Sequence, residues 1–269
     1  MKKQLLFLLF ALLALCASAA PNDVFSVGDI TYSVTLDSYS GKPGIVAVKS
    51  LSAQGKAKTS LKLDIPGVVS YNGYKYKVGV INYDAFKGQS NISVVQIRYN
   101  ITRIAQSAFE NCTSLTTVYM PSSLTNVGYR AFGGCTALRS VYYANATPSS
   151  TSVEPGSFPE NSGMTLYVSK AHPNSRENAR KVTAFDYFST IKKHEYASDF
   201  ILVDHGYFCV TKAPASDGTT RGEMSFVGVY ADDNFSNSWS GTYNNGTADF
   251  DVVEIADSAC LDNTNIKNV

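Results

Sequence analysis

The sequence is short of the residues that carry most enzyme and metal chemistry. Its 269 residues include three histidines and one tryptophan, and only 17% of them are charged. His172, His194 and His205 have no metal-ligand spacing, and none belongs to an HExxH motif. No GxSxG, P-loop or GxGxxG motif stands between a strand pattern and a helix pattern. We therefore expect a non-catalytic protein with no metal and no cofactor.

Two polar segments are the remaining candidates for chemistry. Asp232-Asp233-Asn234 could bind calcium, but the segment lacks the glycine and the distal glutamate of an EF-hand loop, so we interpret it as a solvated hairpin tip. Glu254 and Asp257-Ser258 could supply catalytic groups, but they fall within a repeat pattern that explains them without chemistry.

No stripe of basic residues is present. The chain has 23 lysines and arginines against 22 acidic residues. Loss of Lys2 and Lys3 with a leader would leave 21 against 22, a net charge of −1. This balance argues against nucleic acid and against an anionic membrane as the partner.

The first nineteen residues have the pattern of a secretory signal peptide. Lys2 and Lys3 precede an apolar run from Leu5 to Leu15, and Ala17-Ser18-Ala19 follows it. The run is too short for a membrane span. Lipidation of Cys16 is an alternative, but Leu15 is larger than the residue usually found before a lipidated cysteine. We expect cleavage after Ala19, a secreted or cell-surface protein, and no transmembrane span after signal removal.

Behind this leader, the chain repeats itself with a period of 23 residues. Ile104, Ala108, Phe109, Cys112, Leu115 and Val118 recur as Val127, Ala131, Phe132, Cys135, Leu138 and Val141. The same phase extends back to Ile81, Ala85, Phe86, Ile92 and Val95, and forward, after an insertion at Thr147–Pro155, to Ser157-Phe158 and Leu166-Tyr167-Val168. A fixed period of this length predicts stacked units that share one core.

Each unit is expected to hold a short strand and a tight turn. Val118 and Met120 alternate with polar residues and should point inward, and Pro121 ends the strand. Asn111 and Gly133-Gly134 provide turns. Cys112 and Cys135 share one phase, so we expect two free, buried thiols; a bridge between neighbouring units is the alternative.

Two β-rich segments flank the repeats. Residues 20–78 contain alternating apolar patterns and an Asn72-Gly73 turn, which predict a β flank that caps the array. Residues 197–249 repeat that flank at an offset of 176, and residues 250–269 match the opening of the array at an offset of 174. We predict a signal peptide at 1–19, a solenoid with its terminal cap at 79–196, and an incomplete second array at 250–269.

The repeat also resembles a known family. Ile104 to Pro121 has the pattern Ile-x-x-x-Ala-Phe-x-x-Cys-x-x-Leu-x-x-Val-x-Met-Pro, which resembles the BspA-like leucine-rich-repeat surface proteins of oral and gut anaerobic bacteria and some mucosal protozoa. The next copy departs from it at Leu124 and at Ala144, where proline would follow the strand. The resemblance covers about residues 79–191. It implies a β-rich leucine-rich-repeat solenoid with short parallel strands, surface display, and adhesion to host matrix or other bacteria.

One outward-facing column of residues stands out as a candidate binding site. Gln96, Tyr119 and Tyr142 share a phase, and Tyr167 continues it. The predicted ligand-binding residues are Gln96, Arg98, Thr117, Tyr119, Arg139, Ser140, Tyr142 and Tyr167. Tyrosine and arginine are enriched at interfaces. The alternative is that the stacked tyrosines only stabilise neighbouring strands.

The sequence thus predicts an exported, non-catalytic protein that binds protein or glycan ligands at the cell surface, plausibly an adhesin. One rival interpretation is a carbohydrate-binding accessory of a glycan-utilisation system. Another is a structural fragment of a longer surface protein, with self-association through the uncapped C-terminal repeat.

Overall fold

The structure is a computed structural model that describes residues 22–37, 43–145, 147–149, 152–160, 163–169, 174–194, 200–203, 206–212, 222–229, 242–244 and 249–255. From His194 onward it describes the backbone alone. The chain forms two compact units. One contains Met1–Thr116, Ser123–Leu138 and Thr151–Asn161, and the other contains Thr117–Ser122, Arg139–Ser150 and Ser162–Val269.

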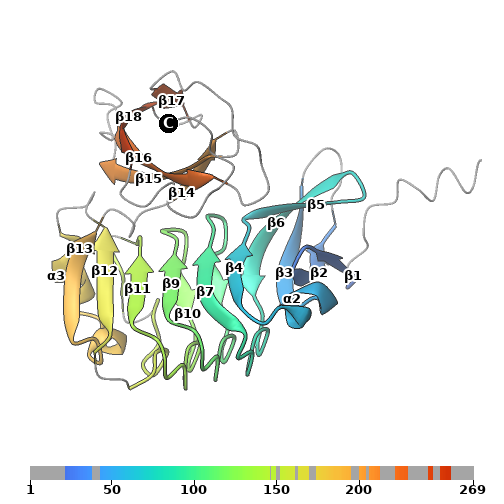
Figure 1. Ribbon diagram of the computed structural model, residues 1–269, viewed down its shortest axis with the longest axis horizontal. Helices are drawn as coiled ribbons and strands as arrows, with labels where there is room; N and C mark the ends of the chain where they lie inside the picture. The colour runs from blue at the N-terminus through green and yellow to red at the C-terminus, as the bar shows by residue number, and fades with distance from the viewer. Residues whose placement is uncertain are drawn as a thin grey trace, which may run out of the picture. The chain divides into compact units, whose positions relative to one another are not determined.

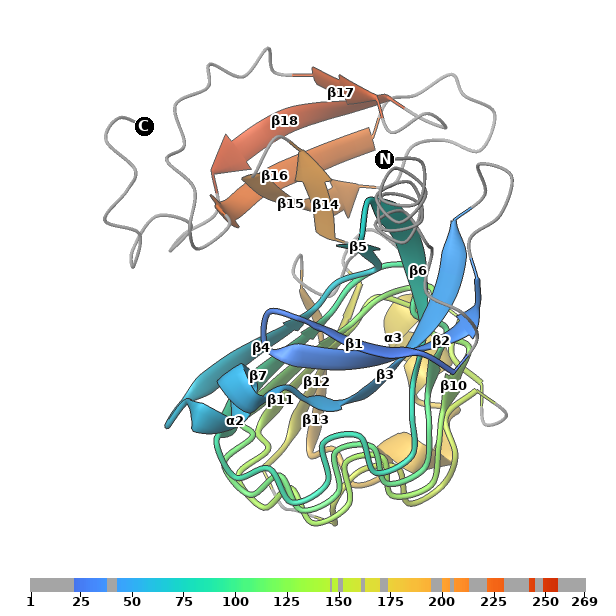
Figure 2. The same cartoon turned by 90° about the vertical axis from the view of Figure 1, so that its right-hand side faces the viewer.

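The first sheet combines an antiparallel edge with parallel strands (Figure 2). Its order is β1-β2-β3-β6-β8-β10, and β5 also pairs with β6. The strands are β1 (Val24–Val27), β2 (Ile30–Leu36), β3 (Gly44–Leu51), β5 (Val68–Tyr71), β6 (Tyr74–Ile81), β8 (Arg103–Ile104) and β10 (Asn126–Val127). The pairs β3–β6, β6–β8 and β8–β10 are parallel. Parallel neighbours joined by long connections are what stacked repeats require.

The second sheet has the order β13-β12-β11-β9-β7-β4 (Figure 1). Its strands are β4 (Leu61–Ile65), β7 (Ile92–Ile97), β9 (Thr117–Met120), β11 (Ser140–Tyr143), β12 (Thr165–Ser169) and β13 (Thr190–His194). Val118 and Met120 are buried, as their alternation predicted. β4 comes from the predicted N-terminal flank, yet it pairs in parallel with β7.

The turns between the two strands of a unit use left-handed backbone at two fixed positions. One position holds Asp84, Ser107 and Arg130, with φ angles of 53°, 58° and 53°. The other holds Gly88, Asn111 and Gly134, with φ angles of 71°, 60° and 72°. Left-handed backbone favours glycine and asparagine. Asn111 and Gly134 had been assigned to turns from the sequence, and the structure confirms this.

A column of phenylalanine rings runs through the core of successive coils. Phe86, Phe109 and Phe132 stack with ring centroids 5.0 and 5.1 Å apart, and Phe158 lies 5.3 Å beyond Phe132. These four rings are at most 2% exposed. The 23-residue phase of the sequence therefore corresponds to one ring per coil.

Cys112 and Cys135 form a second internal column, and both are free and buried, as predicted. Each thiol donates to the carbonyl of the phenylalanine one coil back, with Sγ–O distances of 3.1 Å to Phe86 and to Phe109. The hydrogen bond between the two thiols and their burial raise the pKa of the Cys135 thiol. Cys135 is therefore held as a protonated thiol.

One cluster of ion pairs connects the turns beside the phenylalanine column. Glu110 is 7% exposed and accepts from Lys87 Nζ at 2.9 Å and from Arg130 Nε at 2.7 Å. The hydrogen bond from Lys87, with further bonds from Ser107 and Arg130, lowers the pKa of Glu110 to about 2 against an opposing effect of burial. The carboxylate thus links three consecutive coils as an anion.

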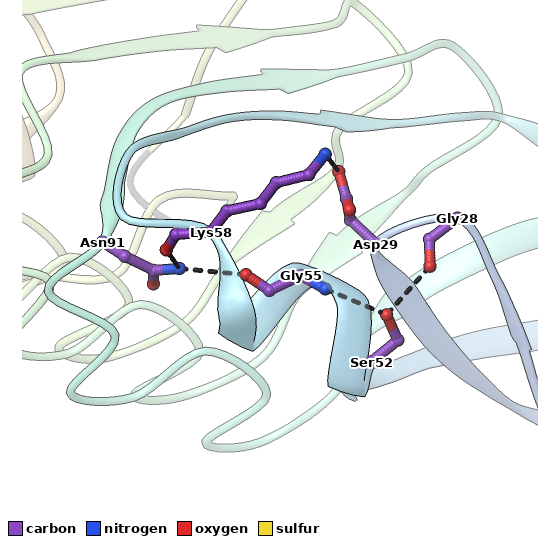
Figure 3. Close-up of polar contacts among 6 residues, drawn as sticks. All are labelled: Gly28, Asp29, Ser52, Gly55, Lys58 and Asn91. Atoms are coloured by element: carbon purple, nitrogen blue, oxygen red, sulfur yellow. Dashed lines mark hydrogen bonds and ion pairs between the residues drawn. The ribbon is translucent and has the colours of Figure 1, made fainter.

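A short helix covers the start of the array. Helix α2 (Ala53–Ala57) begins at Ser52, whose Oγ accepts from the amide of Gly55 at 3.2 Å and donates to the carbonyl of Gly28 at 2.8 Å (Figure 3). Asn91 Nδ2 donates to the carbonyls of Gly55 and Lys58, and Lys58 pairs with Asp29 at 2.7 Å. These contacts attach the helix to Asn91 of the first coil and to Asp29 of the flank.

The array closes on aromatic residues, in the region 79–196 where the sequence predicts a terminal cap. Helix α3 (Ser175–Ala179) and the 3-10 turn η1 (Thr183–Phe185) precede β13. Phe185 and Phe188 are buried and meet edge to face, 5.7 Å apart. The sequence analysis did not identify α2, α3 or β3, because each is too short or irregular to give a clear apolar period.

A third sheet, of the order β14-β15-β16-β18-β17, follows the array. Its strands are β14 (Phe200–Val203), β15 (Gly206–Lys212), β16 (Gly222–Val229), β17 (Thr242–Asn244) and β18 (Asp249–Ile255). This is the segment in which the sequence predicts a second flank. The predicted signal peptide with Cys16, Asp232-Asp233-Asn234, Trp239, and the part of the predicted second array after Ile255 lie outside the described residues.

Candidate functional site

Three tyrosines form the most regular feature of the second sheet. Tyr119, Tyr142 and Tyr167 occupy matching positions of β9, β11 and β12, where Tyr142 is in register with both others. Ring centroids lie 4.6 Å apart between Tyr119 and Tyr142 and 4.4 Å apart between Tyr142 and Tyr167. The ring planes are 13° and 10° from parallel. We call these three residues the tyrosine column.

The position of the column follows from strand alternation. In each strand the residue before the tyrosine is buried, namely Val118, Val141 and Leu166. Because successive side chains of a strand point to opposite faces, the tyrosines lie on the other face, where all three are half-buried. Apolar packing beneath the strands fixes their spacing, and the strand spacing fixes the distance between the rings.

A row of hydroxyl groups runs beside the tyrosine column. Thr117, Ser140, Thr165 and Thr190 are in register on four consecutive strands, two residues before the column in each strand. All four are half-buried. Lys192 continues the column itself, in register with Tyr167, and is exposed. Thr190 and Lys192 were not predicted, because β13 departs from the repeat consensus and only its pairing with β12 reveals their register. Thr165 was also missed, although it lies two residues before the predicted Tyr167.

The stacking determines what the column can contact. Each inner ring face is covered by the neighbouring tyrosine, so the solvent side of the column consists of ring edges and phenol groups. Burial and the neighbouring Tyr167 raise the pKa of Tyr119, so its phenol stays neutral near pH 7. Neutral phenols both donate and accept hydrogen bonds. The column is therefore suited to hydrogen bonds and edge contacts rather than to broad face-on stacking.

The other predicted site residues divide into two groups. Thr117, Ser140 and the tyrosines share one face, as predicted, and Arg139 is exposed one residue before Ser140. Gln96 and Arg98 lie on β7 and just after it, where Gln96 is in register with Asp64. Arg98 binds Asp64 through two hydrogen bonds of 2.8 and 3.1 Å, and its side chain is 12% exposed. Arg98 therefore has a structural partner within its own unit.

The structure also shows whether side chains gather for metal binding in the part of the chain that it describes. No group of three or more His, Cys, Asp or Glu residues lies close enough there to hold a metal ion. Among these described residues, no helix is long and apolar enough to cross a membrane.

Comparison with solved structures returns leucine-rich-repeat proteins of several bacteria. One from Bacteroides ovatus is 25% identical, with 62% of this chain and 40% of that chain covered and a TM-score of 0.43. One from Bacteroides capillosus is 22% identical, with 64% and 98% covered and a TM-score of 0.40. A leucine rich cell surface protein from Faecalibacterium prausnitzii is 17% identical, with 77% and 61% covered and a TM-score of 0.36. This chain thus spans well under half of the Bacteroides ovatus chain.

Comparison with curated proteins gives no match. A sequence model of the BspA type leucine rich repeat region, however, matches residues 75–210 in six copies, which is half of the chain. Repeat regions of this type suggest a protein-interaction role at the cell surface, and leucine-rich-repeat proteins are generally non-enzymatic. With its 23-residue period, its ring-per-coil core and its parallel sheets, this chain belongs to the BspA-type leucine-rich-repeat family.

Proposed function

We propose that this protein is an exported, non-catalytic adhesin that binds a protein partner through the tyrosine column. A signal peptide cleaved after Ala19 would deliver it to the cell surface. The observation that supports the proposal is the stacking of Tyr119, Tyr142 and Tyr167 on one rigid, half-buried sheet face. Tyrosines held in place before binding lose little conformational entropy on contact, which is why rigid aromatic residues anchor interfaces.

The same stacking favours a protein over a glycan as the ligand. Sugar rings bind aromatic side chains mainly through the ring faces, and here the two inner contacts are closed at 4.6 and 4.4 Å. The hydroxyl row of Thr117, Ser140, Thr165 and Thr190 would add hydrogen bonds to a backbone or to polar side chains. The carbohydrate-binding accessory remains the second candidate, because hydroxyl rows also bind sugar hydroxyls.

Binding assays with a paired double variant would test the proposal. Mature protein and Tyr119→Ala/Tyr142→Ala would be applied to immobilised extracellular matrix proteins and to a glycan array. We expect the unmodified protein to bind at least one matrix protein, and the double variant to lose at least about tenfold in affinity, typical of removing interface anchors.

The matched control is Tyr83→Ala/Tyr129→Ala. These two tyrosines are 60% and 47% exposed and lie in the turns rather than on the sheet. Their removal should leave affinity unchanged. Loss of affinity in the control pair with retention in the column pair would place the site on the turns. Binding to the glycan array alone, lost in the column variant, would support the carbohydrate-binding alternative.

A further inference from the structure

The third sheet repeats the topology of the first flank strand by strand. β14, β15, β16, β17 and β18 pair with one another as β1, β2, β3, β5 and β6 do. In each sheet the first two pairings are antiparallel, the third is parallel, and the last is antiparallel. The order of the strands is therefore the same.

The irregularities of the two sheets also correspond. Pairing of β2 with β3 shifts register at Thr31/Tyr32 and at Val34/Leu36, and pairing of β15 with β16 shifts at Tyr207/Phe208 and at Val210/Lys212. These positions are 176 residues apart. The β3–β6 pairing shifts at Val46/Ala47, and the β16–β18 pairing shifts at Met224/Ser225. Matching bulges identify the third sheet as a copy of the β1, β2, β3, β5 and β6 part of the first sheet, since bulges are specific features of a fold.

In the first copy, the side of β6 away from β3 is fully occupied. β5 pairs with its first half, residues 74–77, and β8 pairs with Val80 and Ile81 in its second half. The amide of Thr102 donates to the carbonyl of Gly79 at 2.8 Å, and the amide of Ala105 donates to the carbonyl of Ile81 at 2.9 Å. The next coil of the array thus docks on this half of β6.

In the second copy, the described strands cover only the first half of the corresponding edge. β17 pairs with Asp249, Phe250 and Asp251. Over the segments for which the structure gives a backbone, no strand pairs with the remaining half of β18 on that side. The offset of 174 residues makes Val253 and Ile255 the counterparts of Gly79 and Ile81. An uncovered strand edge leaves backbone donors and acceptors available to another strand.

We propose that the second half of β18 is a docking edge for a further leucine-rich-repeat coil, which runs parallel to β18 as β8 runs parallel to β6. The first copy shows the fit, because there the same half-edge binds such a coil. Glu254 is the counterpart of Val80, and the register partner of Val80 is Arg103. A coil with arginine at the position of Arg103 would place opposite charges across the pair.

An extended chain would test this directly. Val269 is the counterpart of Val95 and lies outside the described residues, so residues 96–194 can be appended after it in repeat phase. Hydrogen exchange of residues 252–255 would be compared between the 269-residue chain and the extended chain. We expect these amides to exchange at least about tenfold more slowly in the extended chain.

Two controls separate specific docking from a general effect of added sequence. An extension that lacks its first residue shifts the register and should give no slowing. Glu254→Lys should weaken the slowing about two- to fivefold, and changing the appended copy of Arg103 to Glu in the same chain should restore it.

Several outcomes would overturn the proposal. Equal exchange in the in-phase and shifted extensions would do so. In the 269-residue chain, strong protection that rises with protein concentration would assign the edge to a second copy of the chain. Strong protection at all concentrations would assign it to the chain's own residues.

Discussion

Two columns of stacked aromatic rings run through this protein, and they differ in their surroundings. The phenylalanine column has centroid spacings of 5.0, 5.1 and 5.3 Å and is closed to solvent. The tyrosine column has spacings of 4.6 and 4.4 Å and is half-buried on a sheet face. Both arise from the same repeat, which places equivalent side chains one strand spacing apart. Ring stacking alone therefore does not distinguish a stabilising column from a binding column.

What distinguishes them is the environment of each ring. A buried phenylalanine is surrounded by other apolar groups, so its removal leaves a cavity. A half-buried tyrosine already meets solvent along one edge, and water can fill the space it leaves. We therefore expect the phenylalanine column to determine stability and the tyrosine column to determine binding.

Removing a ring from the phenylalanine column should give the largest loss of stability. Phe109→Ala should reduce the free energy of unfolding by about 3–5 kcal/mol, the usual range for a buried phenylalanine. Phe109 is fully buried between Phe86 and Phe132. Urea melts followed by circular dichroism would measure this change in the free energy of unfolding. A loss below about 1 kcal/mol, typical of a surface change, would show that this ring does not stabilise the array.

Removing the charge at the centre of the Glu110 ion cluster should give an intermediate loss of stability. Glu110→Gln removes charged hydrogen bonds to Lys87 and Arg130 and should cost about 1.5–3 kcal/mol. Because the folded-state pKa is lowered to about 2, the stabilisation is complete above the unfolded value of about 4.5 and is lost as pH falls toward 2.

Urea melts at several pH values would test the direction of this effect. The difference between the unmodified protein and Glu110→Gln should be constant from pH 6 to 8 and should shrink below about pH 4.5. A difference that persists unchanged at about pH 2.5 would show that Glu110 acts through its shape and not its charge.

The outward column should give a smaller effect on stability. Tyr119→Ala removes one stacked contact, the one with Tyr142, which is worth about 0.5–1.5 kcal/mol. The far-ultraviolet circular dichroism spectrum should not change. A loss comparable to that of Phe109→Ala would show that the tyrosine column stabilises the array as the phenylalanine column does.

The buried state of the two cysteines should appear in their reactivity toward alkylating reagents. Cys112 and Cys135 are fully buried free thiols. Alkylation should label both in denaturant without reductant and neither in the folded protein, because the reagent cannot reach buried thiols. Mass spectrometry of digested protein gives the labelled sites. A linked Cys112–Cys135 peptide would show that the coils are joined covalently.

Much of the fold could be predicted from the sequence because the repeat carries the same information several times. Phe86, Phe109 and Phe132 share one phase, so a single assignment of that phase to the interior placed all three rings correctly. The tyrosines were placed on the outer face by the same logic. The short strands and turns followed from alternation and from turn residues such as Asn111 and Gly134.

The features that the sequence did not predict depend on contacts between segments that are not related by the 23-residue repeat. Arg98 was predicted as a binding residue, but pairing of β7 with β4 brings it to Asp64, 34 residues earlier. Lys192 and Thr190 joined the candidate site only through the register of β13 with β12. α2 covers the first coil because hydrogen bonds from Asn91 hold it there. None of these contacts has a local signal in the sequence.

The sequence by itself therefore determined the period, the inward and outward phases, and the duplicated flank, because these depend on spacing along the chain. Only the tertiary structure decided which polar groups are paired, how the tyrosine rings are oriented, and which half of β18 is left uncovered by the described strands. Those features depend on strand register and on the meeting of distant segments, and such contacts form only when the whole array is folded.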